Sequence, residues 1–249
     1  MPTFAFLDLD GTLVRTNLVH IAVHHAARRA SWGGRAANLL GLAAAAPALA
    51  ALDKLSRTAF QDLFFRGFAE LSEDRLRFLG EHAAEHVLTA NLREGSLDLL
   101  DRIRAAGHEP VLVTGNLAHV VKPFARHLGI RHTASNRLEL RHGVATGRLA
   151  PPLRTGANKA SFIRAFCAKH DAEPEACHAY ADAIADLPML ASVGHPCAVH
   201  PDLSLLSEAR GNQWPVLDLE PSKAKGIPTV MAEAVDRRVS ALVDRAVNR

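Results

Sequence analysis

Short apolar runs alternate with amphipathic segments along most of this 249-residue chain. Each run closes at a polar or turn-forming residue, which is typical of a strand that is buried on both faces of a sheet. The intervening segments repeat apolar residues three and four positions apart, as one face of a helix requires. This alternation predicts βαβ units, and hence an α/β fold with a doubly wound, Rossmann-like parallel sheet. The predicted strands are Phe4–Leu9, Pro110–Val113, His178–Ala181, Cys197–His200 and Pro215–Leu219.

The segments between the later strands predict helices and one hairpin. Gly107 and Gly129 each follow an amphipathic stretch, where glycine commonly ends a helix. Alternating residues on both sides of His142-Gly143 predict a β-hairpin over Arg137–Leu149. The predicted helices are Ser96–Ala106, Leu117–Leu128, Ala157–His170, one that begins at Leu187, and Asp202–Ala209.

Residues 15 to 93 interrupt this alternation, because they contain no convincing strand. Helix-period patterns fill the stretch instead, and Ser72 followed by Glu73 and Asp74 is a typical helix start. The sequence therefore predicts an all-helical module inserted into the sheet domain. Its predicted helices are Leu18–Ser31, Ala36–Leu52, Arg57–Leu71 and Glu73–Thr89.

The segment Ala36–Leu52 carries no charge and is rich in alanine. It is shorter than the roughly 20 residues that a membrane span needs, and Pro47 interrupts it. A buried helical hairpin is the favoured interpretation, and no stable membrane span is expected. An apolar wall of a substrate site or a partner surface stays open as an alternative.

The C-terminal stretch Val230–Val247 places its apolar residues on one face of a helix and charged residues on the other. We expect it to pack on its own domain, and a homodimer through this helix or through the inserted module stays open. The formal charge of +3 and the pI near 9.0 come from scattered basic residues, so no nucleic-acid partner is expected. Three cysteines without a CxxC pair, and a start without a basic leader, favour a cytoplasmic location.

Candidate chemistry gathers where predicted strands end. Asp8, Thr114 and Asp182 each fall immediately after the run of apolar residues of one such strand. Because the carboxyl ends of parallel strands share one edge of a sheet, and ligands bind in the crevice at that edge, these residues are expected to meet there.

The loop Asp8-Leu-Asp-Gly-Thr12 holds two acids separated by one residue. A carboxylate at the end of an apolar strand is costly to bury unless a metal or a hydrogen-bond donor pairs with it. Asp8 and Asp10 on a tight loop suit a nucleophile and a second acid. The backbone amides of Leu9 and Gly11 are candidates for binding a phosphate.

Three further elements complete a candidate phosphate and metal site. Thr114 and the unhindered amide of Gly115 can bind phosphoryl oxygens as charge develops on them. Lys159 lies near the start of a predicted helix. Asp182 and Asp186 supply carboxylate oxygens, the ligands that Mg²⁺ prefers together with water.

These four elements, in this order, resemble the haloacid dehalogenase superfamily of phosphohydrolases. The resemblance rests on DLDGT at 8–12, VTGN at 113–116, Lys159 and DAIADLPML at 182–190, and it extends to about residue 219. The stretch from Val193 to Asp202 looks like the phosphoserine-phosphatase-like branch, subfamily IB. That branch carries a helical C1-type cap between its first two motifs. The resemblance thus implies a discontinuous core at 1–15 and 93–219, a cap at 16–92 and a C-terminal extension at 220–249.

The resemblance also implies roles for the matching residues. Asp8 would attack phosphorus to give an aspartyl-phosphate, and Asp10 would protonate the leaving alcohol and then activate water. Mg²⁺ would be held by the carboxylates of Asp8 and Asp182 and by the backbone carbonyl of Asp10, while Asp186 orients its waters. Thr114 and Lys159 would hold the phosphoryl oxygens.

The chain departs from the family pattern at several places. Ala181, Ala183 and Ala185 stand where the fourth motif usually has polar residues. In phosphoserine phosphatases a glutamate corresponds to Asn17, and a second glycine corresponds to Asn116. These differences argue against phosphoserine itself as the substrate. Candidates for substrate contacts are Asn17, His20, His24, Arg66 and Asn116, and the i, i+4 pair His20 and His24 could alternatively bind a metal.

The sequence therefore predicts a Mg²⁺-dependent phosphatase that acts on a small-molecule phosphate ester. A phosphotransferase that uses the same intermediate is the near alternative, because an alcohol can replace water as the acceptor. A binding or membrane-surface protein with attenuated catalysis is the alternative from another class.

Overall fold

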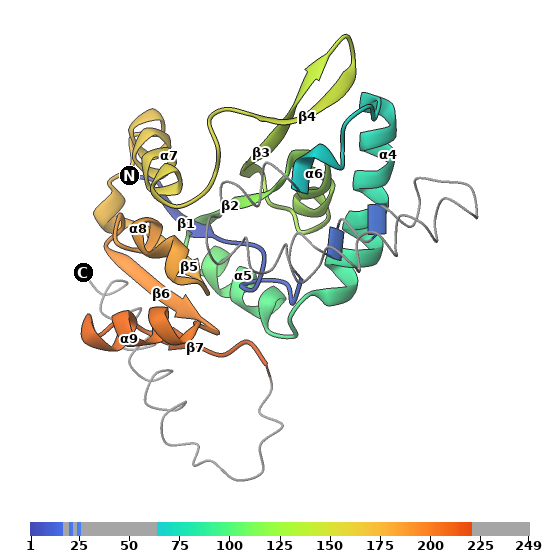
Figure 1. Cartoon of the computed structure of the whole chain (residues 1–249). Coiled ribbons are helices and arrows are strands. Elements are labelled where there is room, and N and C mark those ends of the chain that lie inside the picture. The colour runs from blue at the N-terminus through green and yellow to red at the C-terminus, as the bar shows by residue number, and fades with distance from the viewer. Residues whose placement is uncertain (17–19, 22–23, 26–63, 221–249) are drawn as a thin grey trace. The chain divides into compact units, whose positions relative to one another are not determined.

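The computed structural model describes residues 1–16, 20–21, 24–25 and 64–220 (Figure 1). Within these residues a seven-stranded sheet has the strand order β4-β3-β2-β1-β5-β6-β7. The pairs β1–β5, β5–β6 and β6–β7 are parallel and β3–β4 is antiparallel, which confirms the predicted α/β fold. The strands are β1 (Thr3–Leu7), β2 (His108–Leu117), β3 (His132–Arg141), β4 (Val144–Ala150), β5 (His178–Ala181), β6 (His195–Val199) and β7 (Val216–Leu217).

The described helices follow the predicted ones closely after residue 93. They are α4 (Glu73–Ala83), α5 (Ser96–Ala105), α6 (Ala118–His127), α7 (Ala157–Lys169), α8 (Leu187–Leu190) and α9 (Leu203–Gly211). The predicted helix Glu73–Thr89 is confirmed, but its second half is not α-helical: α4 continues as a π-helical turn at Ala84–Leu88 and a 3₁₀ turn at Thr89–Asn91. The helix predicted to reach Leu71 already ends at Arg66, just before Gly67.

The chain divides into two compact units, and the first comprises Met1–Leu13, Arg93–Val111 and Thr155–Arg249. Its central strand β1 buries every residue from Phe4 to Leu7, as a strand covered on both faces must. The rings of Phe4 and Phe6 both meet Phe166 of α7 edge to face, which is the favoured aromatic geometry. Helix α9 packs against β6 in the same unit (Figure 1). A short apolar strand thus carries the chain straight to the loop that begins at Asp8.

The second unit comprises Val14–Leu92 and Leu112–Arg154. In it α6 packs against both α4 and β3. A side chain at Gly80 of α4 would overlap the backbone carbonyl of His119 on α6, so these two helices approach as closely as glycine allows. The predicted hairpin is confirmed by β3 and β4, and its turn residues His142 and Gly143 both have positive φ, as a tight hairpin turn requires.

The described part of residues 15–93 contains helices, turns and isolated bridges, but no strand. The predicted helices Ala36–Leu52 and Val230–Val247 lie outside the described residues. So do residues 18–19, 22–23 and 26–31 of the first predicted helix and residues 57–63 of the third. The division into core, cap and C-terminal extension remains a prediction. Among the described helices, none combines the length and apolar character needed to cross a membrane.

Ser72 caps α4 as predicted, because its hydroxyl accepts a hydrogen bond from the backbone NH of Arg75 at 3.2 Å. We expect Ser72→Ala to lower the free energy of unfolding by about 1 kcal/mol, since one NH of the first turn loses its partner. Urea denaturation of the purified protein measures this change. Ser207→Ala, an exposed position within α9, is the matched control and should be close to neutral.

Candidate active site

The strand ends place two carboxylates at one edge of the sheet. Asp8 directly follows β1 and Asp182 directly follows β5, as predicted. The two strands are parallel neighbours with Leu7 opposite Tyr180, and the NH of Asp8 donates to the carbonyl of Tyr180 at 2.9 Å. This ladder bond continues the strand pairing by one residue and fixes where the Asp8 side chain leaves the backbone.

Lys159 joins two of the acids. Its Nζ donates to Oδ1 of Asp8 at 2.6 Å and to Oδ1 of Asp186 at 2.8 Å. The three side chains are only 5%, 7% and 8% exposed, so this is a buried charge cluster and not a surface ion pair. Lys159 stands in the first turn of α7, which aims it inward. Burial disfavours its ammonium form, but the two carboxylates outweigh that effect and raise the pKa of Lys159 to about 12.

The environment of Asp8 and Asp182 disfavours the charged form of both carboxylates. Burial raises the pKa of Asp8 well above its usual value, and Lys159 offsets this only partly, because Asp186, Asp182 and Asp10 all push the same pKa upward. Burial likewise raises the pKa of Asp182 to about 6, against the lowering effect of a hydrogen bond from Thr12. A cation beside these two carboxylates would relieve both effects.

The residues present fit a magnesium ion. Among the described residues, no three His, Cys, Asp or Glu side chains are arranged to hold a metal ion. The set implied by the family, however, needs only two side-chain carboxylates, from Asp8 and Asp182, with the carbonyl of Asp10. Mg²⁺ is commonly bound by one or two carboxylates with water and substrate phosphate completing its shell. The destabilised charge on Asp8 and Asp182 is the observation that favours a cation there.

Gly11 turns the loop back toward Asp182. Its φ is 87°, in the left-handed region that favours glycine, and a Cβ there would overlap the carboxylate of Asp182. The next residue ties the same two segments together, because the Thr12 hydroxyl donates to Oδ1 of Asp182 at 2.9 Å. The loop after β1 and the loop after β5 are therefore in direct contact.

Replacing Gly11 by alanine should destabilise the protein and disturb Asp182. We expect Gly11→Ala to cost about 1–3 kcal/mol, from the positive φ together with the overlap. Gly107→Ala is the matched control, because Gly107 has a φ of 82° and no atom within 4 Å of an added Cβ. Chemical denaturation of both variants separates the cost of the positive φ from the cost of the overlap with Asp182. Equal losses in the free energy of unfolding would show that the overlap costs nothing.

Thr114, Gly115 and Asn116 lie in the second unit, and the prediction that a strand ends before them is wrong. Strand β2 continues through them to Leu117. The Thr114 hydroxyl is buried and accepts from the NH of Asn116 at 3.0 Å, while the Asn136 amide donates to the Gly115 carbonyl at 2.8 Å. These bonds hold the three residues in a fixed local conformation.

The predicted substrate residues are not gathered into one place by the described structure. Asn17 lies outside the described residues, and His20 and Arg66 are exposed. His24 contacts the ring of His82, with Nε2 and Nδ1 3.1 Å apart. No metal-binding group that includes His20 and His24 is found among the described residues.

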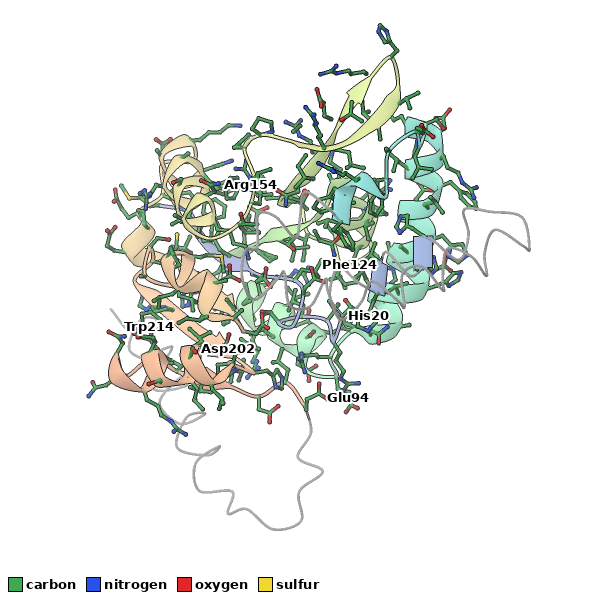
Figure 2. All side chains as sticks on the ribbon, in the orientation of Figure 1. His20, Glu94, Phe124, Arg154, Asp202 and Trp214 are labelled. Atoms are coloured by element: carbon green, nitrogen blue, oxygen red, sulfur yellow. The ribbon has the colours of Figure 1, made fainter. Side chains whose placement is uncertain are left out.

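Three residues near the loops were not predicted as site residues. Thr12 bonds Asp182, as described above. The Arg93 guanidinium donates to the Gly11 carbonyl. Asp202, at the start of α9 (Figure 2), accepts from the NH of Ile184 at 2.8 Å, and its own NH donates to the Asp182 carbonyl at 2.8 Å. Asp202 was predicted as the beginning of a helix and as the last residue of the stretch that resembles the phosphoserine-phosphatase-like branch, but not as a residue that holds the loop carrying Asp182 and Asp186.

Comparison with known proteins agrees with this arrangement. The chain is 34% identical over 143 residues to a probable phosphatase of Mycobacterium tuberculosis. The matched stretch covers 57% of this chain and 50%, about half, of the relative's length. It is 28% identical over 258 residues to the phosphoserine phosphatase SerB1 of the same organism, covering 98% of this chain and 81% of the relative. A solved structure of a protein with unknown function from Bordetella pertussis Tohama I superposes with a TM-score of 0.77 at 24% identity, over 88% of this chain and 99% of that one. The family model of haloacid dehalogenase-like hydrolases matches residues 5–191, a span that contains Asp8, Lys159, Asp182 and Asp186. The chain therefore belongs to the haloacid dehalogenase-like hydrolases.

Proposed function

We propose that this chain is a Mg²⁺-dependent phosphomonoester hydrolase that acts on a small-molecule phosphate ester through an aspartyl-phosphate on Asp8. The observation that carries the proposal is the buried carboxylate of Asp8, held 2.6 Å from the ammonium of Lys159 at the carboxyl end of β1. A carboxylate fixed by a cation beside a metal-compatible acid is what nucleophilic attack on a phosphate dianion requires. The names of two relatives, probable phosphatase and phosphoserine phosphatase, support the same reaction class.

Each step assigns a task to a named side chain. The Asp8 carboxylate attacks phosphorus and the bond to the ester oxygen breaks, while Asp10 gives its proton to the leaving alcohol. Asp10 then takes a proton from the water that attacks phosphorus and frees Asp8 with inorganic phosphate as product. Lys159 reduces the repulsion between Asp8 and the incoming phosphate. Asp8, Asp182 and the Asp10 carbonyl would hold Mg²⁺, which would supply positive charge beside the phosphoryl oxygens.

The remaining predicted residues would bind the phosphoryl group or orient the catalytic side chains and water. The amides of Leu9, Gly11 and Gly115 and the hydroxyl of Thr114 would donate to phosphoryl oxygens. Asp186 would fix the position of Lys159, with which it forms a 2.8 Å ion pair, and orient metal-bound water. Ala181, Ala183 and Ala185 offer no polar side chain beside these groups, so we expect a modest turnover rate.

The substrate is proposed as a small phosphate ester other than phosphoserine, because Asn17 and Asn116 replace the residues that the phosphoserine enzymes use. His20, His24 and Arg66 are the candidates for recognising the leaving group. Closure of a helical cap over the site would exclude water and select that group.

A panel of phosphate esters tests the proposal. Phosphoserine, sugar phosphates, nucleotides, phosphocholine and lipid phosphates are each incubated with the protein and Mg²⁺, and released phosphate is measured. We expect turnover of at least one ester, its loss with excess chelator and its return with Mg²⁺. Turnover that persists in chelator would contradict the magnesium role, and no release from any ester would contradict the proposed activity.

A further inference from the structure

Arg93 holds the loop that follows the proposed nucleophile. Its Nε and Nη2 atoms donate to the backbone carbonyl of Gly11 at 3.0 and 2.8 Å, so two N–H groups of one guanidinium bind the same oxygen. The third nitrogen, Nη1, donates to Oε1 of Glu220 at 2.7 Å. The Arg93 side chain is only 15% exposed. This planar fork has a fixed geometry, and it therefore constrains the direction of the Gly11 carbonyl more than a single hydrogen bond would.

The backbone around Arg93 holds the same part of the chain. The NH of Arg93 and the hydroxyl of Ser96 both donate to the Leu13 carbonyl, at 3.0 and 2.8 Å. The NH of Gly95 donates to the carbonyl of Leu219, the residue before Glu220, at 2.8 Å. The turn that starts α5 thus binds the loop after β1 on one side and the segment of Glu220 on the other.

Glu220 completes the arrangement because it balances the charge of a guanidinium that is mostly removed from water. Its carboxylate side chain is 29% exposed and meets the one nitrogen of Arg93 that does not face Gly11. A charged pair of this kind fixes the plane of the guanidinium as well as its position. Without Glu220, the Nη1 group would turn toward water and carry the other two donors with it.

We propose that Arg93 and Glu220 are positioning residues for catalysis, which set the Gly11 peptide and, through it, the place of Asp10. This inference rests on the proposed function, since Asp10 matters as the acid and base of that reaction. Gly11 has no side chain to lock its own conformation, and it follows Asp10 directly. On the far side Thr12 is held by Asp182 at 2.9 Å. The Gly11 carbonyl is therefore the point between these residues where the loop needs a second support.

The test compares Arg93→Met, Arg93→Lys and Glu220→Gln with Arg104→Met, a control at an exposed arginine of α5. Two quantities are measured on each full-length protein: kcat and KM for the best ester of the panel, and hydrogen exchange of the amides of residues 9–13. We expect Arg93→Met to lower kcat on the order of 10- to 100-fold with little change in KM, because the reacting groups are misplaced while the ester still binds. Arg93→Lys should recover part of kcat, Glu220→Gln should show a smaller loss, and Arg104→Met should match the parent protein.

Exchange of residues 9–13 should speed up in Arg93→Met and, less strongly, in Glu220→Gln, while the amides of β5 and β6 keep the parent rate. Unchanged exchange of residues 9–13 would overturn the proposal, and so would a fall in kcat that only tracks the fraction of unfolded protein. If the parent protein hydrolyses no ester, the proposed function fails, and the exchange rates still decide whether Arg93 fixes the Gly11 peptide.

Discussion

Asp8→Asn is expected to abolish phosphate release while leaving the protein folded. Asparagine has the shape of aspartate but no nucleophilic oxygen anion, and losing a covalent nucleophile costs at least about 10³-fold in kcat. The fold should tolerate the change, because the amide oxygen can still accept from Lys159 and Asp186 keeps its ion pair with that lysine at 2.8 Å. Removing a carboxylate whose pKa burial raises also removes a desolvation cost. We therefore expect the free energy of unfolding to stay within about 1 kcal/mol of the parent.

Released phosphate and urea denaturation are measured on the same preparation, so that activity and folding are separated. Asp98→Asn, at an exposed position of α5, is the matched control and should retain the parent kcat. Turnover by Asp8→Asn near the parent rate would rule out Asp8 as the nucleophile. A variant that is inactive and also unfolded would show instead that the carboxylate is needed for the structure.

Lys159→Met should differ from Asp8→Asn in its effect on folding, because we expect it to lose stability as well as activity. Methionine fills a similar volume, but it leaves the carboxylates of Asp8 and Asp186 buried without their shared cation. Removing one partner of a buried ion pair typically costs about 3–5 kcal/mol. Lys169→Met, an exposed lysine at the end of the same helix α7, is the control and should change stability little.

The loss in Lys159→Met should depend on pH in a defined direction. Without the ammonium, the pKa of Asp8 rises further above that of an unfolded aspartate, so the folded variant binds a proton that the unfolded chain releases. A raised folded-state pKa favours folding at low pH, and this support disappears as pH rises. Denaturation at pH 5 and pH 8 should therefore show a smaller difference from the parent at pH 5. An equal loss at both pH values would mean that packing, and not charge, is what Lys159 provides.

The sequence allowed some of these residues to be found because their signals are local. Asp8 and Asp182 close short apolar runs, and such runs are strands whose parallel pairing brings their ends together. Thr114 was misplaced relative to its strand because Thr-Gly-Asn resembles a turn, whereas β2 runs through these residues to Leu117. The helix start at Ser72 was correct because a cap is a matter of neighbouring residues.

Other residues have no local signal at all. Lys159 could be suspected only from the family pattern, since a lysine in the first turn of a helix is ordinarily exposed. Arg93 contacts Gly11 across 82 positions of the chain, and Asp202 contacts Ile184 across 18. Such contacts depend on how strands and helices pack, which single-residue patterns do not encode.

The buried cluster of Lys159, Asp8 and Asp186 has a consequence for how the protein would respond to its surroundings. Asp8, the proposed nucleophile, has a counter-ion in Lys159 that belongs to the polypeptide, so part of its charge is offset before any divalent ion binds. We expect scarcity of Mg²⁺ to slow the reaction far more than it lowers the amount of native protein. The Mg²⁺ concentration would then control the rate of turnover, and the folded protein would regain activity as soon as Mg²⁺ is restored.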